Sequence, residues 1–289
     1  MKITDDKNIM EAMGARLELL IDLALVEDLD KAGDVSSTSI FEDQTDCYFL
    51  LSKDEGIFCG ADAISRVCAK VDSTLGVTLF FKDGDEVKRG DLIAKIEGKI
   101  SSILQAERTA INFISFLSGI ATATNQLVKA NKSGATILDT RKTLPGYRLL
   151  SKYAVLCGGG QNHRIGLYDM VMIKDNHIDG AGSIENAVNL VRQRWGNKFK
   201  IEVETRNLDE VQSALELGVD RIMLDNMDDE TMKSATDLIA KRCETEASGN
   251  MSVKRISTSA LSGIDYISFG SITHSVKAFD FSLRKENHL

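Results

Sequence analysis

Cationic side chains are concentrated between Asp139 and His177, in the segment DTRKTLPGYRLLSKYAVLCGGGQNHRIGLYDMVMIKDNH. They are Arg141, Lys142, Arg148, Lys152, His163, Arg164, Lys174 and His177, whereas the whole chain has a formal net charge of −8. A local cationic cluster in an acidic protein predicts a pocket for a small, multiply anionic ligand. A nucleic-acid surface would usually make the whole domain basic.

Two carboxylates, Glu204 and Asp225, lie at the ends of apolar runs further along the chain. Side chains alternate along a strand, so Glu202 and Glu204 of KIEVET share one face. Glu204 is nearest the strand end, where it and Asp225 could face the same binding site. There they could hold ribose hydroxyls, bind Mg²⁺ directly or through water, or stabilise a developing positive charge. The alternative is that they only neutralise Lys174 and Arg141. Glu202 lies deeper and is expected to be structural.

Glycine and serine pairs follow two later apolar runs. Ser248, Gly249 and Asn250 follow one, and Gly270 and Ser271 follow the other. Backbone N–H groups between a strand and a helix form an anion site, so both places predict phosphate binding. Such pairs are also common in ordinary turns.

The elements that carry these residues alternate between strands and helices. Strands are expected at Thr136–Thr140, Met170–Lys174, Lys200–Glu204, Arg221–Leu224, Cys243–Ala247 and Tyr266–Phe269, with helices such as Ile184–Arg194, Leu208–Leu217 and Asp229–Lys241 between them. Repeated strand–helix units with apolar strands predict a parallel sheet. There are six or seven such units, and no GxGxxG motif follows the first strand. This favours a closed α/β barrel over a dinucleotide-binding sheet. In such a barrel the strand ends and the loops after them carry the chemistry.

The first part of the chain has a different pattern of predicted helices and strands. Helices are expected at Ile9–Ala24, Asp62–Val71 and Glu107–Lys129, and between the last two lies a β-rich module with turns at Asp83-Gly84 and Gly90-Asp91. No apolar run approaches the ~20 residues of a membrane span. The five scattered cysteines favour reduced, mostly buried thiols and a cytoplasmic protein over disulfides or a zinc site.

Several motifs together resemble the quinolinate phosphoribosyltransferase family. They are EDLDKAGDVSS, ERTAINFISFLSGIAT, DTRKTLPGYR, GGGQNHRIGLYD, IKDNHI, EVET, IMLDNM, EASGN and ISFGSITHSVKAFDFSL. They span nearly the whole chain in family order, and NHR with KDNH is the most specific pair. The resemblance implies an α/β fold with an N-terminal α+β open sandwich over residues 1–115, joined by the C-terminal segment 275–289. A seven-stranded α/β barrel is expected over residues 116–274.

The resemblance also implies a reaction and a site. Quinolinate and phosphoribosyl pyrophosphate would give nicotinate mononucleotide, pyrophosphate and CO2, with Mg²⁺, in de novo NAD biosynthesis. Lys142, Lys174, Glu204 and Asp225 would be catalytic. Quinolinate and the phosphoribosyl group would contact Arg108, Arg141, Lys142, His163, Arg164, Lys174, Glu204, Asp225, Ser248, Gly249, Asn250, Gly270, Ser271 and His274. Glu204 and Asp225 would hold Mg²⁺, and Arg108 would reach the pocket of a partner subunit, so at least a homodimer is expected.

Two other functions stay open at this point. A related barrel glycosyltransferase, linked to molybdenum transport, could use a different acceptor, although NHR and KDNH argue against it. A non-catalytic barrel could bind phosphorylated metabolites as a sensor. The presence of a complete set of residues for catalysis argues against its loss, and the cationic surplus favours a dicarboxylate over nicotinate. The set is Arg141, Lys142, His163, Arg164, Lys174, Glu204 and Asp225.

Overall fold

The computed structural model describes residues 6–258 and 261–285, which form two compact units. The first unit draws on residues 1–125, 143–159 and 272–289, and the second on 126–142 and 160–271. The predicted boundary between residues 115 and 116 lies inside the long helix α4 (Ile100–Ala130). Residues 143–159, expected in the barrel, belong to the first unit, where α5 (Arg148–Cys157) packs against α1 (Asp6–Leu29).

The first unit contains an antiparallel sheet in the order β12-β1-β5-β3. Its strands are β12 (Phe281–Lys285), β1 (Thr45–Ser52), β5 (Leu92–Lys99) and β3 (Gly76–Leu79). The C-terminal strand β12 thus pairs with β1, early in the chain. A second, two-stranded sheet joins β2 (Gly56–Ile57) to β4 (Glu86–Val87).

Helices α1, α3 (Ala61–Val71) and α4 complete this unit, with the short α2 (Ser37–Ile40) before β1. The predicted helices in these places are confirmed, and α1 and α4 are longer than expected. Phe58, Ile64, Ile93 and Ile114 are fully buried between these helices and the sheet. Burying a side chain of this size stabilises the fold by about 1.5–3 kcal/mol relative to leaving it exposed.

The second unit contains a parallel sheet in the order β6-β11-β10-β9-β8-β7. The strands are β6 (Thr136–Leu138), β7 (Val171–Ile173), β8 (Ile201–Thr205), β9 (Arg221–Asp225), β10 (Glu244–Ser248) and β11 (Tyr266–Ser268). All six predicted strands are therefore confirmed to within two residues at each end. A single parallel bridge between Leu138 and Gln161 continues the sheet beyond β6. Among the described residues no ladder joins β6 to β7, so the closed seven-stranded barrel stays a prediction.

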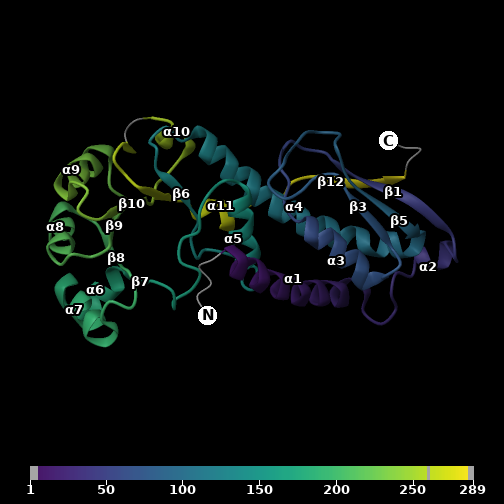
Figure 1. Cartoon of the computed structure of the whole chain (residues 1–289), viewed down its shortest axis with the longest axis horizontal. Helices are drawn as coiled ribbons and strands as arrows, with labels where there is room; N and C mark the ends of the chain where they lie inside the picture. Colours follow the sequence, from purple (N-terminus) through teal and green to yellow (C-terminus); the bar gives the residue numbers. More distant parts are fainter. Residues whose placement is uncertain (1–5, 259–260, 286–289) are drawn as a thin grey trace. The chain divides into compact units, whose positions relative to one another are not determined.

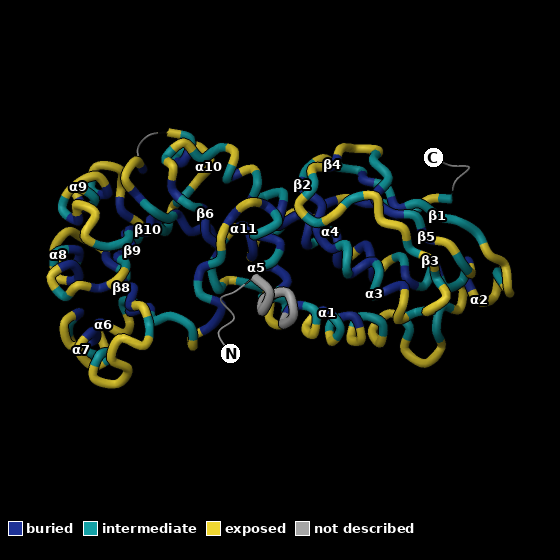
Figure 2. Tube along the Cα trace, viewed as in Figure 1, coloured by how far each residue is buried: buried dark blue, intermediate teal, exposed yellow. Residues whose placement is uncertain are grey.

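The strands of this unit follow an arc with helices on its outer side (Figure 1). These helices are α6 (Asp175–Ala181), α7 (Ile184–Trp195), α8 (Leu208–Glu216), α9 (Asp229–Ile239) and α10 (Val253–Ile256). The short α11 (Ser271–His274) begins in this unit and continues into the first. Ser183, Asn207 and Asp228 each accept a backbone N–H at the start of α7, α8 and α9. Such caps fix where each helix begins after its strand. Exposed residues lie on the outer faces of these helices, and the strands are largely buried (Figure 2).

The cysteines are less buried than expected. Cys59 and Cys68 are buried, but Cys47, Cys157 and Cys243 are only half-buried, and none of the five forms a disulfide in the part of the chain that the structure describes. The expectation of mostly buried thiols is wrong in this respect, since three of the five are partly exposed. Within the described residues, no helix has the combination of length and apolar character that a bilayer crossing requires.

Candidate active site at the carboxyl end of the parallel sheet

Lys174 and Glu204 form an ion pair where β7 and β8 end. The Lys174 Nζ atom lies 2.5 Å from Glu204 Oε2, and the Glu204 side chain is only 13 % exposed. Lys174 occupies its place because the KDNH sequence makes the first turn of α6, where the Lys174 backbone N–H donates to His177 Nδ1. The predicted strand-end cation and carboxylate therefore lie together.

Asp225 stands at the end of the neighbouring strand β9 and interacts with the same group. Burial raises the pKa of Asp225, and the negative charge of Glu204 raises it further; Asn226, Lys174 and Lys142 act in the opposite direction. Glu204 and Asp225 are thus a close pair of carboxylates with two lysines around them. Oxygen donors that repel each other in this way match the ligands preferred by Mg²⁺.

The loop after β10 holds Asp225 in position. The Asn226 side chain donates to Asp225 Oδ2 over 2.7 Å, and its backbone N–H donates to Ser248 O over 2.9 Å. Gly249 has a φ of +74°, and a Cβ atom there would lie 2.2 Å from Asn226 Oδ1. Only glycine fits both this left-handed conformation and the close approach. Gly249 is therefore required for the position of Asn226, in addition to any role with a ligand.

Two guanidinium groups lie near each other in the same unit. Arg141 follows β6 and Arg164 follows the bridge residue Gln161. Burial lowers the pKa of Arg164, and the positive charge of Arg141 lowers it further. The Arg164 side chain also donates to Met170 O over 3.1 Å. Like charges held this close form a site that an anion would stabilise.

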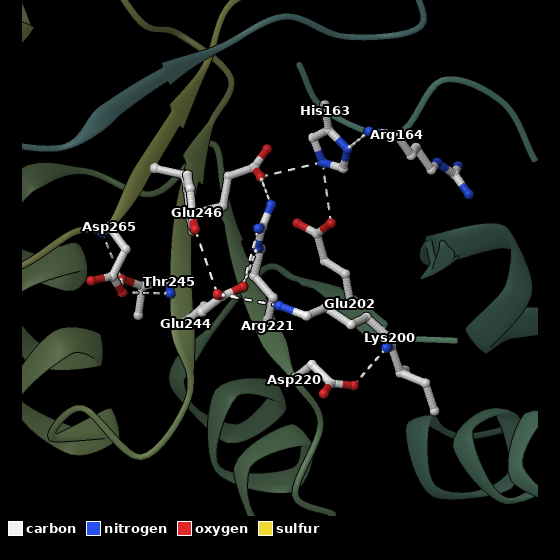
Figure 3. Close-up of polar contacts among 12 residues, drawn as sticks. His163, Arg164, Lys200, Glu202, Asp220, Arg221, Glu244, Thr245, Glu246 and Asp265 are labelled. Atoms are coloured by element: carbon white, nitrogen blue, oxygen red, sulfur yellow. Dashed lines mark hydrogen bonds and ion pairs between the residues drawn. The ribbon is translucent and has the colours of Figure 1, made fainter. Parts of the chain in front are cut away.

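His163 belongs to a buried polar network inside the sheet (Figure 3). Its Nε2 atom lies 3.1 Å from Glu202 Oε2 and 3.2 Å from Glu246 Oε2, and both carboxylates are fully buried. Arg221 Nη1 lies 3.1 Å from the same Glu246 oxygen. Beneath the ring, the His163 backbone N–H donates to Asp139 Oδ1 over 2.9 Å.

Sequence reasoning did not single out Glu246, Arg221 or Asp139 for this network. The sequence offers one signal for the network. Glu246 lies in the middle of a buried strand, and its side chain points to the opposite face of the strand from that of its neighbour Ala247. A fully buried carboxylate almost always has a partner, so Glu246 predicts an inward-facing cation or hydrogen-bond donor.

The remaining predicted residues of this sheet lie in loops and short helices. Ser248 ends β10, and Gly270 precedes α11. The helices that follow, α10 and α11, have four residues each, so their dipoles contribute less than the sequence reasoning assumed. Asn250 has a φ of +49°, and Ser271 is exposed. Phosphate binding here would depend on local backbone N–H groups.

Arg108 and His274 belong to the first unit. Arg108 is exposed on α4 and lines a cavity of 360 Å³ with α1 and Tyr147. The exposed His274 Nδ1 atom lies 2.7 Å from Ser275 Oγ. The structure describes each of these residues within its own unit, and the roles implied for them stay predictions.

Family comparisons cover both units. Residues 34–118 match the model of the quinolinate phosphoribosyl transferase N-terminal domain, and residues 120–284 match that of the C-terminal domain.

Individual relatives match over nearly the full length. The chloroplastic nicotinate-nucleotide pyrophosphorylase [carboxylating] of Arabidopsis thaliana is 45% identical, with 94% of this chain and 84% of that protein covered. The probable nicotinate-nucleotide pyrophosphorylase [carboxylating] of Bacillus subtilis is 41% identical, with 93% of each covered. The crystal structure of NadC from Streptococcus pyogenes superimposes with a TM-score of 0.90 at 40% identity, covering 93% of this chain and 96% of that one. This chain belongs to the quinolinate phosphoribosyltransferase family.

Proposed function

We propose that this chain transfers the phosphoribosyl group of phosphoribosyl pyrophosphate to quinolinate, giving nicotinate mononucleotide, pyrophosphate and CO2. The observation that carries the proposal is the placement of two guanidinium groups, Arg141 and Arg164, in one unit with the carboxylates Glu204 and Asp225. The first pair suits a dianionic acceptor, and the second suits a ribosyl donor with its metal. Family membership supports the same reaction.

Quinolinate would bind to the cationic side of the site. Its two adjacent carboxylates match two guanidinium groups, each of which can donate two parallel N–H bonds to a carboxylate. Binding would relieve the repulsion between Arg141 and Arg164. His163 would contribute by hydrogen bonding to Arg164 itself, since its buried ring accepts the Arg164 backbone N–H at Nδ1 and its own backbone N–H is bound to Asp139.

The phosphoribosyl donor would bind to the opposite side, at Lys142, Lys174, Glu204 and Asp225. The donor set fits Mg²⁺, since two oxygen ligands lie close enough for the charge of one to raise the pKa of the other. When bound there, Mg²⁺ would neutralise part of the pyrophosphate charge. The ammonium groups of Lys142 and Lys174 would neutralise the rest, after Lys174 exchanges its Glu204 partner for a phosphate oxygen.

The proposed chemistry requires no covalent intermediate with the protein. The bond between ribose C1 and the pyrophosphate oxygen breaks, the electron pair leaves with pyrophosphate, and positive charge develops on the ribose. Glu204 and Asp225 are placed to stabilise that charge. The pyridine nitrogen then bonds to C1 and becomes cationic. When the adjacent carboxylate leaves as CO2, the electron pair of the broken bond stays on the ring carbon, where the neighbouring cationic nitrogen stabilises it. That carbon then uses the pair to bond a proton from solvent, and the nitrogen keeps its positive charge in the product. The protein contributes positioning and fixed charge.

The 5′-phosphate of the donor would be held by the loops after β10 and β11. Ser248, Gly249 and Asn250 form the first loop, and Gly270, Ser271 and His274 belong to the second. Short helices follow both, so we assign the binding to backbone N–H groups and hydroxyls more than to helix dipoles.

The active assembly would be at least a homodimer. Arg108 is exposed on α4 and is therefore available to a partner subunit. The resemblance to the family implies that it enters the partner's pocket. A cytoplasmic location is proposed on the basis of the free thiols and the absence of a span-length apolar helix in the described part.

The proposal is tested by mixing purified protein with phosphoribosyl pyrophosphate, Mg²⁺ and either quinolinate or nicotinate. Nicotinate mononucleotide from quinolinate, with one CO2 for each product, is the expected result. Product from nicotinate alone would contradict the assignment of a dicarboxylate. Donor binding without turnover of either acceptor would instead favour the phosphometabolite-binding function.

A further inference from the structure

The His163 ring is held at both nitrogens. Nδ1 accepts the backbone N–H of Arg164 over 2.7 Å. Nε2 faces Glu202 Oε2 and Glu246 Oε2 at 3.1 Å and 3.2 Å. Only 4 % of the imidazole side chain is exposed. The orientation of His163 is therefore tied directly to the backbone of the next residue, Arg164.

These contacts define one tautomer. A nitrogen that accepts an N–H bond carries no proton, so Nδ1 is bare and the proton of the neutral ring lies on Nε2. The Nε2–H group then points between Glu202 Oε2 and Glu246 Oε2 and is not directed at either oxygen alone. This is the geometry of a three-centre hydrogen bond.

The hydrogen bonds also favour this neutral Nε2–H ring over two other states, a doubly protonated ring and a ring bound to a metal ion. Burial lowers the pKa of His163, but Glu202 and Glu246 raise it to about 9 overall, which would favour a doubly protonated ring. The second proton would sit on Nδ1 and face the Arg164 N–H, so geometry opposes it. A metal ion bound at Nε2 would move the proton of a neutral ring to Nδ1 and meet the same opposition. The His163, Glu202 and Glu246 group, although compact enough for a metal, is thus better explained as a hydrogen-bond network.

Glu246 connects His163 to a fixed support. One of its oxygens, Oε2, lies 3.2 Å from His163 Nε2 and 3.1 Å from Arg221 Nη1. Arg221 has further anchors, because it also binds Glu244 Oε2 at 3.1 Å and stacks 4.0 Å from the ring centroid of Tyr266. Arg221 would keep its position without Glu246, whereas His163 would lose the acceptor that is attached to this rigid group (Figure 3).

We propose that Glu246 is a positioning residue for the acceptor site: it fixes the Nε2–H tautomer and the ring orientation of His163, and through Nδ1 it places Arg164. The proposal rests on the proposed function, since it assigns Arg164 to the acceptor. Glu202 is the second acceptor for the same N–H. Glu246 contacts no substrate in this account and acts only through His163.

The matched variants are Glu246→Gln and Glu244→Gln. Both remove one carboxylate charge from Arg221 and both lie on β10, but only Glu246 contacts His163. In the Glu246 variant, Arg221 would repel the amide NH2 group, and the NH2 group would turn toward Nε2. That contact would favour the other tautomer and disturb the Arg164 N–H bond.

The kinetic arm measures KM for each substrate and kcat. We expect Glu246→Gln to lower kcat/KM for quinolinate by about 10- to 100-fold with an unchanged KM for phosphoribosyl pyrophosphate, because misplacement of a binding group by about 1 Å has effects of this size. Glu244→Gln should behave like the unaltered protein. Equal effects of the two variants, or equal losses for both substrates, would overturn the proposal.

The spectroscopic arm does not depend on activity. Nitrogen-15 labelling of the four histidines reports which ring nitrogen is protonated, and loss of one signal set in His163→Gln assigns His163. The unaltered protein should show a protonated Nε2 and a bare Nδ1. A doubly protonated ring, or a proton on Nδ1, would overturn the proposal even if the Glu246 variant fails to fold. If the unaltered protein fails to convert quinolinate, the proposed function fails separately from this result.

Discussion

The candidate site separates its charges by chemical task. Arg141 and Arg164 form a cationic pair, whereas Glu204 and Asp225 form an anionic pair in which Glu204 is bound to Lys174. A purely structural set of buried ions would pair each cation with one carboxylate. Here the positive charge of Arg141 lowers the pKa of Arg164 and the negative charge of Glu204 raises the pKa of Asp225, which is the arrangement expected where ligands complete the charge balance.

At the residue scale, the shape of the guanidinium group should matter as well as its charge. We expect Arg164→Lys to raise the KM for quinolinate by about 10- to 100-fold, since the loss of a charge-assisted hydrogen bond costs about 1.5–3 kcal/mol and a lysine cannot donate in a fork. Steady-state kinetics with each substrate varied in turn measures this. Arg192→Lys is the control, because Arg192 is an α7 residue whose side chain donates to Gly218 O. An equal rise for both substrates would contradict an acceptor role.

At the scale of elements, sequence periodicity predicted the parallel strands well but not the elements inside the cationic segment. β8 and β9 were recognisable because Val203, Ile222 and Leu224 are fully buried and lie in apolar runs. Helix α5 was missed, since Lys152 is fully buried and breaks the expected apolar pattern. The identity of the partners in the Glu246 network could not be predicted, because its members come from the strands β8, β9 and β10 and from one loop.

The Asp83-Gly84 turn, predicted without any further role, connects α3 to α5. Asp83 Oδ1 accepts the N–H groups of Gly60 and Ala61 over 2.7 Å and 2.9 Å, and Oδ2 accepts the Tyr153 hydroxyl over 2.7 Å. We expect Asp83→Ala to lower the free energy of unfolding by about 2 kcal/mol, from a lost helix cap and a lost hydroxyl bond. Urea denaturation measures it. Asp85→Ala, which removes one exposed bond from Lys82 N, should cost clearly less; an equal cost would disprove the capping role.

Asp265 links β11 to β10 and should make stability depend on pH. Its Oδ2 accepts from the N–H and hydroxyl of Thr245, and its Oδ1 accepts from Lys241 Nζ. Burial raises the pKa of Asp265, but these bonds lower it overall. A lowered folded-state pKa contributes stability above the ordinary value of 3.8, and this is lost as pH falls through the lowered pKa.

We therefore expect Asp265→Asn to cost about 1–3 kcal/mol of unfolding free energy from neutral pH down to about pH 4, with the difference shrinking as the pH falls further below 3.8. Urea denaturation across this range measures it. Asp237→Asn is the control, because Asp237 pairs with Lys233 on the exposed face of α9 and should contribute almost nothing. A cost for Asp265→Asn that stays constant with pH would show that shape, and not charge, is what matters.

At the scale of the whole molecule, an acidic chain with a net charge of −8 would avoid nonspecific contact with polyanions, while the proposed cationic site would select small ones. The proposed assembly adds one more cation to that pocket. If Arg108 of one subunit completes the site of the partner, the two subunits depend on each other for activity, and subunit mixing can test this directly.

We expect Arg108→Ala and Lys174→Ala each to be nearly inactive alone and to recover activity when mixed after dissociation. In a mixed dimer, one site combines the intact Lys174 of one subunit with the intact Arg108 of the other. Random pairing makes half of the dimers mixed, each with one complete site of two, so about a quarter of the original activity should return. Mixing Glu204→Ala with Lys174→Ala is the control: both changes lie in the same unit of the chain, so every site in the mixed dimer keeps one of them and activity stays low. If the Arg108 mixture also stays inactive although mixed dimers form, Arg108 acts within its own subunit.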